Sequence, residues 1–401
     1  MTEAVEQSKI LKSPLNETHQ RLGATMIEQD GCLVPGSYGD TLFEYAAVRE
    51  RGAGLIDLSS RGRILVSGTE AVQFLNGLIT NDMKTLAENS WMPAAFPNVQ
   101  GRLIASVRVI RLKDKGIDRN VCPAFLLDTE APTHERVLQT IERFTLAGDF
   151  RVTDVTHETA MLSVQGKNAA EIVRRVLGDD TEMPGLNQAT QIAWPQGAGT
   201  AENVLDYESG VIVIPATHTS ADGFDFILAA AQAPDLWNTL QNVGARPVGY
   251  EALETLRIEA GAPRYGTDMD ETNVVTETAL DDAVSYTKGC YVGQEIIARI
   301  KYRGHVAKKL TGVLFQMPRD IEAGGLIRST DGKEIGRTTS LTYSPHLGRT
   351  IALAYLKYDY LASGTSVIVD SKPEGVAAQV VALPFVVDSR TMAADKEAEA
   401  D

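Results

Sequence analysis

The pattern of apolar and polar positions predicts alternating strands and helices over the first half of the chain. Capping boxes at Thr41–Glu44 and Ser67–Glu70 predict the starts of two helices. From residue 62, a first β-α-β-β-α-β unit is expected at 63–67, 72–79, 102–112, 120–128, 132–147 and 150–155. A second unit follows at 160–165, 166–177, 210–215, 223–229 and 234–243. This order predicts an α+β fold with two related ferredoxin-like lobes and mainly antiparallel sheets.

The pattern changes after a further helix at 249–260. Short strands bounded by turn residues are expected at 309–315, 334–343, 350–357, 365–370 and 376–383. They predict a separate small all-β barrel or sandwich. The expected parts are an N-terminal extension at 1–37, a two-lobed region at 38–305, a C-terminal β-barrel at 306–388 and a disordered tail at 389–401.

Composition and charge exclude several classes of function. The chain has 401 residues, enough for two or three domains, and a net charge of −15 that argues against broad binding to nucleic acid or anionic membranes. No apolar run is long enough to span a membrane, and the first residues lack the pattern of a signal peptide. The 3 cysteines form no CxxC pair, so neither a zinc ribbon nor a ferredoxin-type cluster is expected, and no metal site. We expect a cytoplasmic protein in a reducing compartment.

The segment 288–295, KGCYVGQE, has the most unusual composition in the chain. It places Cys290 between Gly289 and Gly293, behind Lys288 and just before a helix-like run. Glycines allow close approach of a ligand or a positive φ, and a lysine and a helix N-terminus both favour a thiolate. Free cysteines are more often small buried hydrophobic residues, and that is the alternative for Cys290. The polar neighbours favour a reactive thiol instead.

Two cationic features have both a structural and a functional interpretation. The stretch Arg299–Lys309 carries a dense group of cations, which indicates either a solvated helix end or a site for an acidic ligand or partner. Arg257 lies beside the apolar face of the 249–260 helix, with acidic residues nearby. It is either a surface ion pair or a guanidinium fork for a ligand carboxylate, and the second interpretation is favoured. No Walker A loop, GxSxG, GxGxxG or HExxH occurs, and the acidic group at 268–271 lacks the pattern of a calcium loop.

The text KGCYVGQE followed by RIKYRGH resembles the signature of the YgfZ family, folate-binding relatives of the glycine-cleavage T-protein. Further segments that resemble the family are spread over most of the region 38–385: GLIDLSSRGRI, FLNGLITND, GYEALETLRIEAGAPRYGTDMDE, TSLTYSP and LPF. The resemblance implies two interwoven lobes of the T-protein-like folate-binding fold, a C-terminal β-barrel and tetrahydrofolate, or a folate derivative, as cofactor. It also implies a folate site that includes Arg257 and Tyr265. The carboxylate that recognises the pterin in T-proteins matches Asp222 or Asp225 only weakly.

One departure from T-proteins bears on the chemistry. Those proteins resemble this chain at 101–106 but carry two aspartates there, and this chain has Ala105 and Ser106. Transfer of a carbon unit to folate needs a positioned proton acceptor or charge partner, and neither residue supplies a carboxylate. The resemblance to the YgfZ family is favoured for this reason.

The leading hypothesis is a tetrahydrofolate-binding accessory protein that supports assembly or repair of iron–sulfur enzymes, including tRNA-modifying ones, and is not itself an enzyme. The alternative is a folate-dependent aminomethyltransferase, methyltransferase or demethylase of the T-protein type, and a third is a scaffold whose folate pocket has decayed. Expected partners are folate and iron–sulfur client proteins, without direct nucleic-acid or membrane binding. The candidate reactive residues are Cys290 and Lys288. The candidate folate-binding residues are Arg257, Tyr265, Asp225, Gly289, Tyr291, Gly293, Gln294, Glu295 and Arg303.

Overall fold

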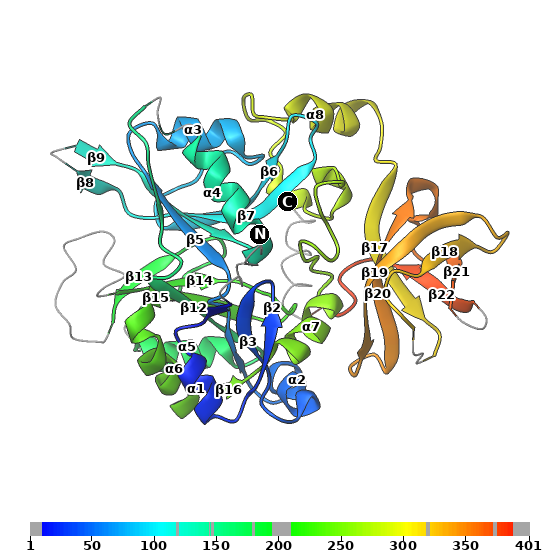
Figure 1. The fold of residues 1–401 in the computed structure, drawn as a ribbon, viewed down its shortest axis with the longest axis horizontal. Coiled ribbons are helices and arrows are strands. Elements are labelled where there is room, and N and C mark those ends of the chain that lie inside the picture. Colours follow the sequence, from blue (N-terminus) through cyan, green and yellow to red (C-terminus); the bar gives the residue numbers. More distant parts are fainter. Residues whose placement is uncertain are drawn as a thin grey trace, which may run out of the picture.

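The structure, a computed structural model, contains two α+β lobes with a β-barrel beside them (Figure 1). It describes residues 10–117, 120–143, 145, 148–178, 181–194, 210–317, 321–371 and 375–387. The tail predicted at 389–401 lies outside these residues. No helix in the described ranges is long and apolar enough to cross a membrane.

The N-terminal residues form a small sheet that packs on the second lobe. Its elements are β1 (Leu11–Lys12), α1 (Asn16–Arg21), β2 (Thr25–Gln29) and β3 (Cys32–Ser37), followed by α2 (Thr41–Arg49). His19 Nε2 lies 2.9 Å from a carboxylate oxygen of Asp57, which also accepts a hydrogen bond from Ser13. The segment predicted as an extension is therefore bonded to the core. The cap of α2 is Asp40, whose carboxylate accepts from two backbone N–H groups of the first turn.

The first lobe is a five-stranded sheet with two helices. Its elements are β5 (Gly62–Ser67), α3 (Ala71–Leu78), β6 (Ser90–Pro97), β7 (Leu103–Arg111), β10 (Ala124–Thr129), α4 (His134–Glu142) and β11 (Arg151–Asp154), with a hairpin of β8 (Lys115–Ile117) and β9 (Asn120–Cys122). The strand order is β11-β5-β10-β7-β6. The predicted ferredoxin-like unit is confirmed, with β6 as an additional edge strand that the sequence does not predict.

The second lobe repeats this arrangement with one exchanged strand. Its elements are β4 (Gly54–Asp57), β12 (Thr159–Gln165), α5 (Ala169–Leu177), β13 (Thr190–Ala193), β14 (Gly210–Pro215), β15 (Gly223–Ala229), α6 (Ala233–Asn242) and β16 (Arg246–Pro247). The strand order is β13-β14-β15-β12-β4-β16. β4 occupies the position that β11 has in the first lobe, although β4 precedes the first lobe in the chain. The two lobes are therefore interwoven, as expected.

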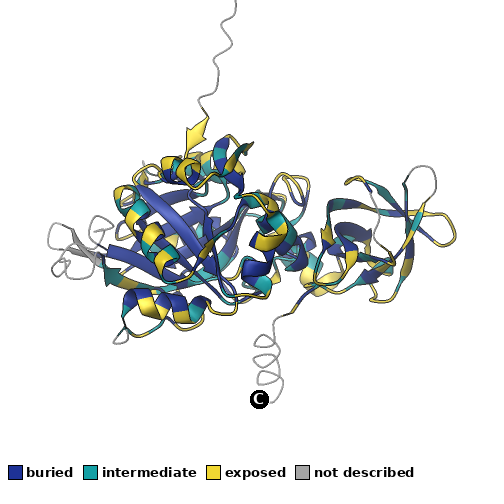
Figure 2. Cartoon of the chain, turned by 90° about the horizontal axis from the view of Figure 1, so that it is seen from below, coloured by how far each residue is buried: buried dark blue, intermediate teal, exposed yellow. Residues whose placement is uncertain are grey.

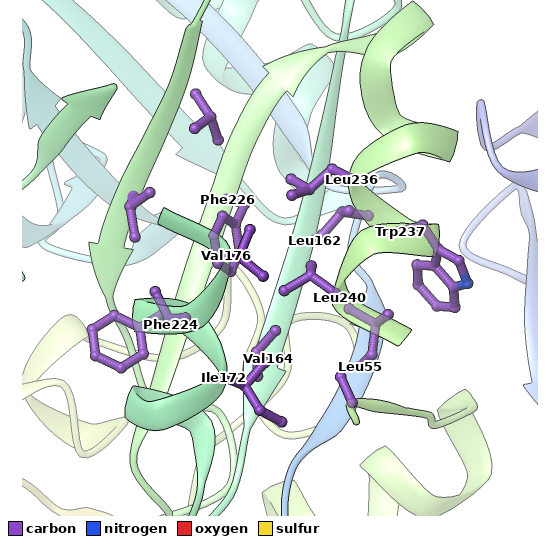
Figure 3. Close-up of a cluster of buried hydrophobic side chains, with 14 of the residues drawn as sticks. Leu55, Leu162, Val164, Ile172, Val176, Phe224, Phe226, Leu236, Trp237 and Leu240 are labelled. Carbon is purple, nitrogen blue, oxygen red and sulfur yellow. The ribbon is translucent and has the colours of Figure 1, made fainter. Parts of the chain in front are cut away.

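The two sheets pack with their inner faces together and their outer faces under helices. Helices α5 and α6 cover the second sheet through a core that includes Trp237, Phe226 and Leu162 (Figure 3). Helices α3 and α4 cover the first sheet in the same way. Between the sheets, Ile110 and Leu126 of the first lobe meet Ile227 and other apolar residues of the second. Burial of these faces supplies the main driving force for the arrangement (Figure 2).

A long connection leads from the lobes to the barrel. It contains α7 (Tyr250–Glu259) and α8 (Gln294–Arg303). The barrel is closed by β17 (Lys308–Phe315), β18 (Leu326–Ser329), β19 (Glu334–Ser344), β20 (Arg349–Lys357), β21 (Ser366–Val369) and β22 (Val376–Val381), in the order β17-β20-β19-β18-β21-β22. Helix α7 lies between the lobes and the barrel (Figure 1) and contacts β19 and β20. The predicted barrel is confirmed.

Candidate functional site between the lobes

Charged side chains form a continuous chain between the two sheets. Arg61 Nε lies 2.6 Å from Asp128, and Arg108 Nη2 lies 3.0 Å from the same carboxylate. Arg108 Nη1 lies 2.8 Å from Asp225, which also contacts His218 Nε2 at 3.0 Å. Arg108 and Asp128 belong to β7 and β10 of the first lobe, and Asp225 belongs to β15 of the second. These five residues, the inter-lobe charge chain, therefore join the lobes through a buried ion pair.

Burial and pairing act in opposite directions on the carboxylates of this chain. Burial alone would raise the pKa of Asp225, but His218 and Arg108 hold that pKa below its ordinary value. Burial would likewise raise the pKa of Asp128, and Arg61 and Arg108 lower it. Both carboxylates are ionised at neutral pH. The Asp225 carboxylate, 0% exposed, is already engaged by Arg108, His218 and the side chain of Ser163.

Two hydrogen-bond donors beside the charge chain have no acceptor. Arg108 Nε and Trp91 Nε1 are both buried and make no hydrogen bond to the described residues. The Arg108 guanidinium carbon lies 5.6 Å from the centroid of the Trp91 ring. An unsatisfied buried donor costs about 1–3 kcal/mol, so this part of the inner face is suited to a ligand that carries acceptors.

The inner face of the first sheet continues from Arg108 to Ser106. Strand alternation puts both residues on that face, and Ser106 pairs with Ala95 of β6. Ser106 remains half-buried, whereas Ala105 is 0% exposed in the core under α3 and α4. Of positions 105 and 106, only position 106 faces the second lobe.

At the far end of the same face, the structure brings Tyr265 and Tyr291 into one buried cluster, which also contains Ala95 and Ile297. The Tyr265 hydroxyl accepts a hydrogen bond from Arg136 Nη1 at 3.3 Å. Burial raises the pKa of Tyr265, and it raises the pKa of Tyr291 to about 12. Both phenols are therefore neutral at physiological pH.

Lys288 anchors the segment that carries Cys290. The sequence suggests that Lys288 supports a thiolate, but its ammonium is buried and donates to the backbone carbonyls of Asn76, Ile79 and Asn81 at 2.6–2.9 Å. These carbonyls lie at and beyond the end of α3, where backbone acceptors have no partner within the helix. Burial lowers the pKa of Lys288 to about 8. The lysine therefore fixes the loop to the first lobe.

The two glycines of the segment have different environments. Gly293 has φ +77°, and a Cβ there would overlap the carbonyl oxygen of Asn98 and lie 3.0 Å from the Gly101 Cα. Gly289 has nothing within 4 Å of such a Cβ. Gly293 thus permits the close approach of the β6–β7 turn, which is the turn that leads to Ser106, while Gly289 has no steric requirement.

Cys290 and Glu295 are the exposed side chains of the segment, whereas Val292 packs against the core of the first lobe. Cys290 is exposed, whereas Cys32 and Cys122 are buried, so the interpretation of Cys290 as a buried hydrophobic residue is wrong. Gln294 and Glu295 form the first turn of α8, and Glu295 is exposed.

The cations that follow Cys290 divide into free and engaged groups. Arg303 is exposed near the end of α8. Lys309 is 2.8 Å from Asp281, and Lys301 lies over the ring of Tyr286. Some of the cations at Arg299–Lys309 are therefore engaged in local contacts. Among the described residues, no cluster of His, Cys, Asp or Glu could hold a metal ion.

Arg257 joins α7 to the barrel. Its guanidinium donates to Asp268 at 2.5 Å, to Ser340 of β19 at 2.6 Å, and to Glu254 and the carbonyl of Ala262. Burial disfavours its charged form, but Glu254 and Asp268 raise its pKa above the ordinary value. All three nitrogens already have acceptors, so a ligand would have to displace one of them.

The inter-lobe charge chain contains residues that sequence reasoning overlooks. Of the five residues, only Asp225 is predicted from the sequence to bind a ligand. Asp222, the other candidate carboxylate, lies just before β15. Arg108 and Asp128 each lie within an apolar strand. A charged residue in such a strand indicates a buried ion pair, because charged residues are seldom buried without a partner. Trp91 and His218 follow no recognisable spacing.

The comparisons with known proteins cover both parts of this architecture. Residues 15–288 match the GCVT N-terminal domain, and residues 308–386 match the glycine cleavage T-protein C-terminal barrel domain. The chain belongs to the glycine cleavage T-protein family. An aminomethyltransferase from Rubrobacter xylanophilus is 32% identical over 95% of this chain and 96% of its own length. One from Thermotoga neapolitana is 31% identical over 93% of this chain and 97% of its own length.

A solved T-protein has the same fold. The glycine cleavage system aminomethyltransferase T from Bartonella henselae superposes with a TM-score of 0.81 at 24% identity, over 94% of this chain and 98% of that one. The predicted combination of two interwoven lobes and a barrel is thus the T-protein architecture. Within this family, the position of Ser106 between the charge chain and the tyrosine cluster makes the inter-lobe face the candidate site.

Proposed function

We propose that the chain binds tetrahydrofolate between its lobes and transfers a one-carbon unit to it, as an aminomethyltransferase-like enzyme. The observation that carries the proposal is the match to aminomethyltransferases along nearly the whole chain, 95% of it for the relative from Rubrobacter xylanophilus. The unsatisfied donors of Arg108 and Trp91 fit a ligand with acceptor atoms at this face. These points favour the transferase over the non-enzymatic role that the sequence alone suggests.

The residues of the inner face fit a bound folate in separate ways. Tyr265 and Tyr291 offer apolar ring surface at one end, and the charge chain offers polar groups at the other. Bound tetrahydrofolate would supply the nitrogen that accepts the carbon unit. Ser106 lies between the two ends and supplies a hydroxyl where T-proteins supply a carboxylate. We also propose that Arg257 and Arg303 contact the folate directly.

A turnover assay of variants at position 106 tests the transferase proposal. Formation of methylenetetrahydrofolate from an aminomethyl donor is measured for the wild type, Ser106→Asp and Ser106→Ala. We expect slow turnover by the wild type and Ser106→Ala, and a rate at least about 100-fold higher for Ser106→Asp, because a positioned carboxylate acts as the proton acceptor. If all three proteins bind tetrahydrofolate and none turns over, the transferase proposal is wrong.

A second candidate is a YgfZ-type accessory role for iron–sulfur enzymes, including tRNA-modifying ones. It is favoured by the exposure of Cys290 on a loop that Lys288 and Gly293 fix to the first lobe. Cys290→Ala is then expected to abolish complementation of an iron–sulfur enzyme defect. Cys32→Ala, which changes a buried thiol, is the matched control. Full complementation by Cys290→Ala would exclude a thiol-dependent accessory role.

A further inference from the structure

We propose that Glu130 is the proton acceptor for the one-carbon transfer, acting in place of a carboxylate at position 106. This inference rests on the proposed function and assigns a role to a residue outside the charge chain. Glu130 directly follows β10, and its backbone stays extended, with φ −69° and ψ 143°. By strand alternation its side chain therefore lies on the inner face of the first sheet, with those of Leu126 and Asp128.

Strand register places Glu130 across from Ser106. β10 and β7 are antiparallel and pair as far as Thr129 with Val107. The next position along β10 is Glu130, and the facing position along β7 is Ser106. Directly opposed residues of antiparallel strands have Cβ atoms about 5 Å apart. A carboxyl at position 130 can therefore reach the space in front of Ser106.

One oxygen of the Glu130 carboxyl is available to accept a proton. Oε2 accepts a hydrogen bond from the backbone N–H of Tyr265 at 2.9 Å. Oε1 has no hydrogen-bond partner within the described ranges, and the residue is only half-buried. The carboxylates of the charge chain differ in this respect, because Asp128 and Asp225 are both engaged by guanidinium groups.

The surroundings also give Glu130 a higher proton affinity than the charge chain has. Burial raises the pKa of Glu130, and the neighbouring Asp128 carboxylate adds to this effect. Arg61, the Tyr265 N–H and Arg264 oppose the rise without reversing it. The pKa of Asp128 is instead lowered by its guanidinium partners. A base whose pKa lies closer to the operating pH is the more effective acceptor, and at this face that base is Glu130.

The transfer releases protons that an acceptor must carry. Two bonds form from folate nitrogens to the carbon of the aminomethyl group, while the bonds from that carbon to its carrier and to its amino nitrogen break. The two N–H protons lost from the folate end on the carrier and on the released ammonia, so the carbon keeps its oxidation state. Glu130 takes the proton of the attacking nitrogen on Oε1 and returns it to the leaving group. Because it reaches this space from the neighbouring strand, it supports the slow turnover expected of the wild type.

An NMR titration of the glutamate carboxyl groups in the full chain tests the position and basicity of Glu130 without turnover. The resonance of Glu130 is the one that Glu130→Gln removes. We expect it to titrate above the ordinary glutamate pKa of about 4.3. Ser106→Asp should raise its pKa further and Ser106→Ala should not, because two opposed carboxylates disfavour each other's ionisation.

Turnover of a double variant separates a proton acceptor from a residue that only supports the fold. We expect Glu130→Gln to bind tetrahydrofolate like the wild type and to lower kcat about 100-fold. Ser106→Asp combined with Glu130→Gln should keep a kcat within about threefold of Ser106→Asp alone, because the new carboxylate replaces the lost acceptor. Glu135→Gln, at an exposed position of α4 bonded to Gln139, is the matched control with the wild-type rate.

Each other outcome overturns the assignment. If the wild type turns over and Glu130→Gln keeps its rate, the acceptor lies elsewhere and the proposed function stands. If the double variant stays inactive while Ser106→Asp is active, Glu130 has a structural role only. A Glu130 carboxyl that titrates at or below the ordinary value, or that does not respond to Ser106→Asp, does not lie where the assignment needs it. If wild type and Ser106→Asp both bind tetrahydrofolate and neither turns over, the proposed function fails and this inference fails with it.

Discussion

Asp225 is the residue at which stability and the candidate site are most closely linked. Its buried carboxylate neutralises Arg108 and contacts His218 Nε2, and its replacement by Asn would leave the guanidinium short of a counter-charge. We expect Asp225→Asn to lower the free energy of unfolding by about 3 kcal/mol at pH 7, measured by urea denaturation.

The pH dependence of this effect follows from the direction of the pKa shift. Because the pKa of Asp225 is lower in the folded protein, its stabilisation is present above the ordinary carboxyl pKa, about 3.9, and is lost as the pH falls through the folded-state value. The difference between wild type and Asp225→Asn should therefore be constant from pH 7 to about pH 5 and shrink below about pH 4. Asp331→Asn, which changes an exposed pair with Lys333, is the control without measurable effect. A difference that grows on acidification would contradict the assignment.

The two glycines around Cys290 give a matched pair of substitutions. Gly293→Ala combines a positive φ with overlap against Asn98, so we expect it to destabilise the protein by about 2 kcal/mol or more. Gly289→Ala meets open space and should change stability by less than about 0.5 kcal/mol. Chemical denaturation measures both. Equal tolerance of the two substitutions would show that the 293 turn does not lie against the β6–β7 turn as described.

At the scale of elements, Lys288 connects the end of α3 to the segment before α8. Lys288→Met leaves the carbonyls of Asn76, Ile79 and Asn81 without their donor. We expect faster amide hydrogen exchange over 285–292 and over the last turn of α3, while exchange in the barrel is unchanged. Lys84→Met, at an exposed nearby position, is the control. Unchanged exchange over 285–292 in Lys288→Met would contradict the anchoring role.

The sequence predicts most elements, but it predicts neither the strand β6 nor the pairing of β4. β6 contains Pro93 and Pro97, which argue against a strand, and the structure tolerates them because β6 is an edge strand. β4 is a short apolar run, and nothing in its pattern shows that it pairs with β12 rather than with the strand that follows it. Such pairing between distant segments is decided by the packing of the whole sheet, not by local periodicity.

The site is predictable only where residues share a local motif. The segment 288–295 is recognisable because its glycines, lysine and cysteine are adjacent in sequence. The charge chain draws Arg61, Arg108, Asp128, His218 and Asp225 from separate strands and loops, and only strand register brings them together. Arg257 is predicted to bind a ligand from its place beside an apolar helix face and from the resemblance, while its contacts with Asp268 and Ser340 depend on how the barrel docks.

At the scale of the whole molecule, Arg257 holds the barrel against the lobes. Arg257→Met would remove its bond to Ser340 of the barrel and leave the buried Asp268 without a cation, held only by hydrogen bonds from the Arg264 backbone N–H and the Thr339 hydroxyl. We expect a loss of about 3 kcal/mol and a separate, earlier unfolding transition for the barrel, seen by differential scanning calorimetry. Arg328→Met, which changes an exposed pair within the barrel, is the control that keeps the wild-type profile. A single unshifted transition in Arg257→Met would contradict the role.

Tetrahydrofolate binding between the interwoven lobes is the basis of the proposed function. The most direct measurement is an anaerobic calorimetric titration of the full chain with tetrahydrofolate. We expect saturable binding of one tetrahydrofolate per chain, which Arg108→Lys weakens and Arg111→Lys does not. Absence of binding heat, together with an unchanged unfolding temperature at saturating tetrahydrofolate, would contradict it, because a ligand that binds the folded state must stabilise that state.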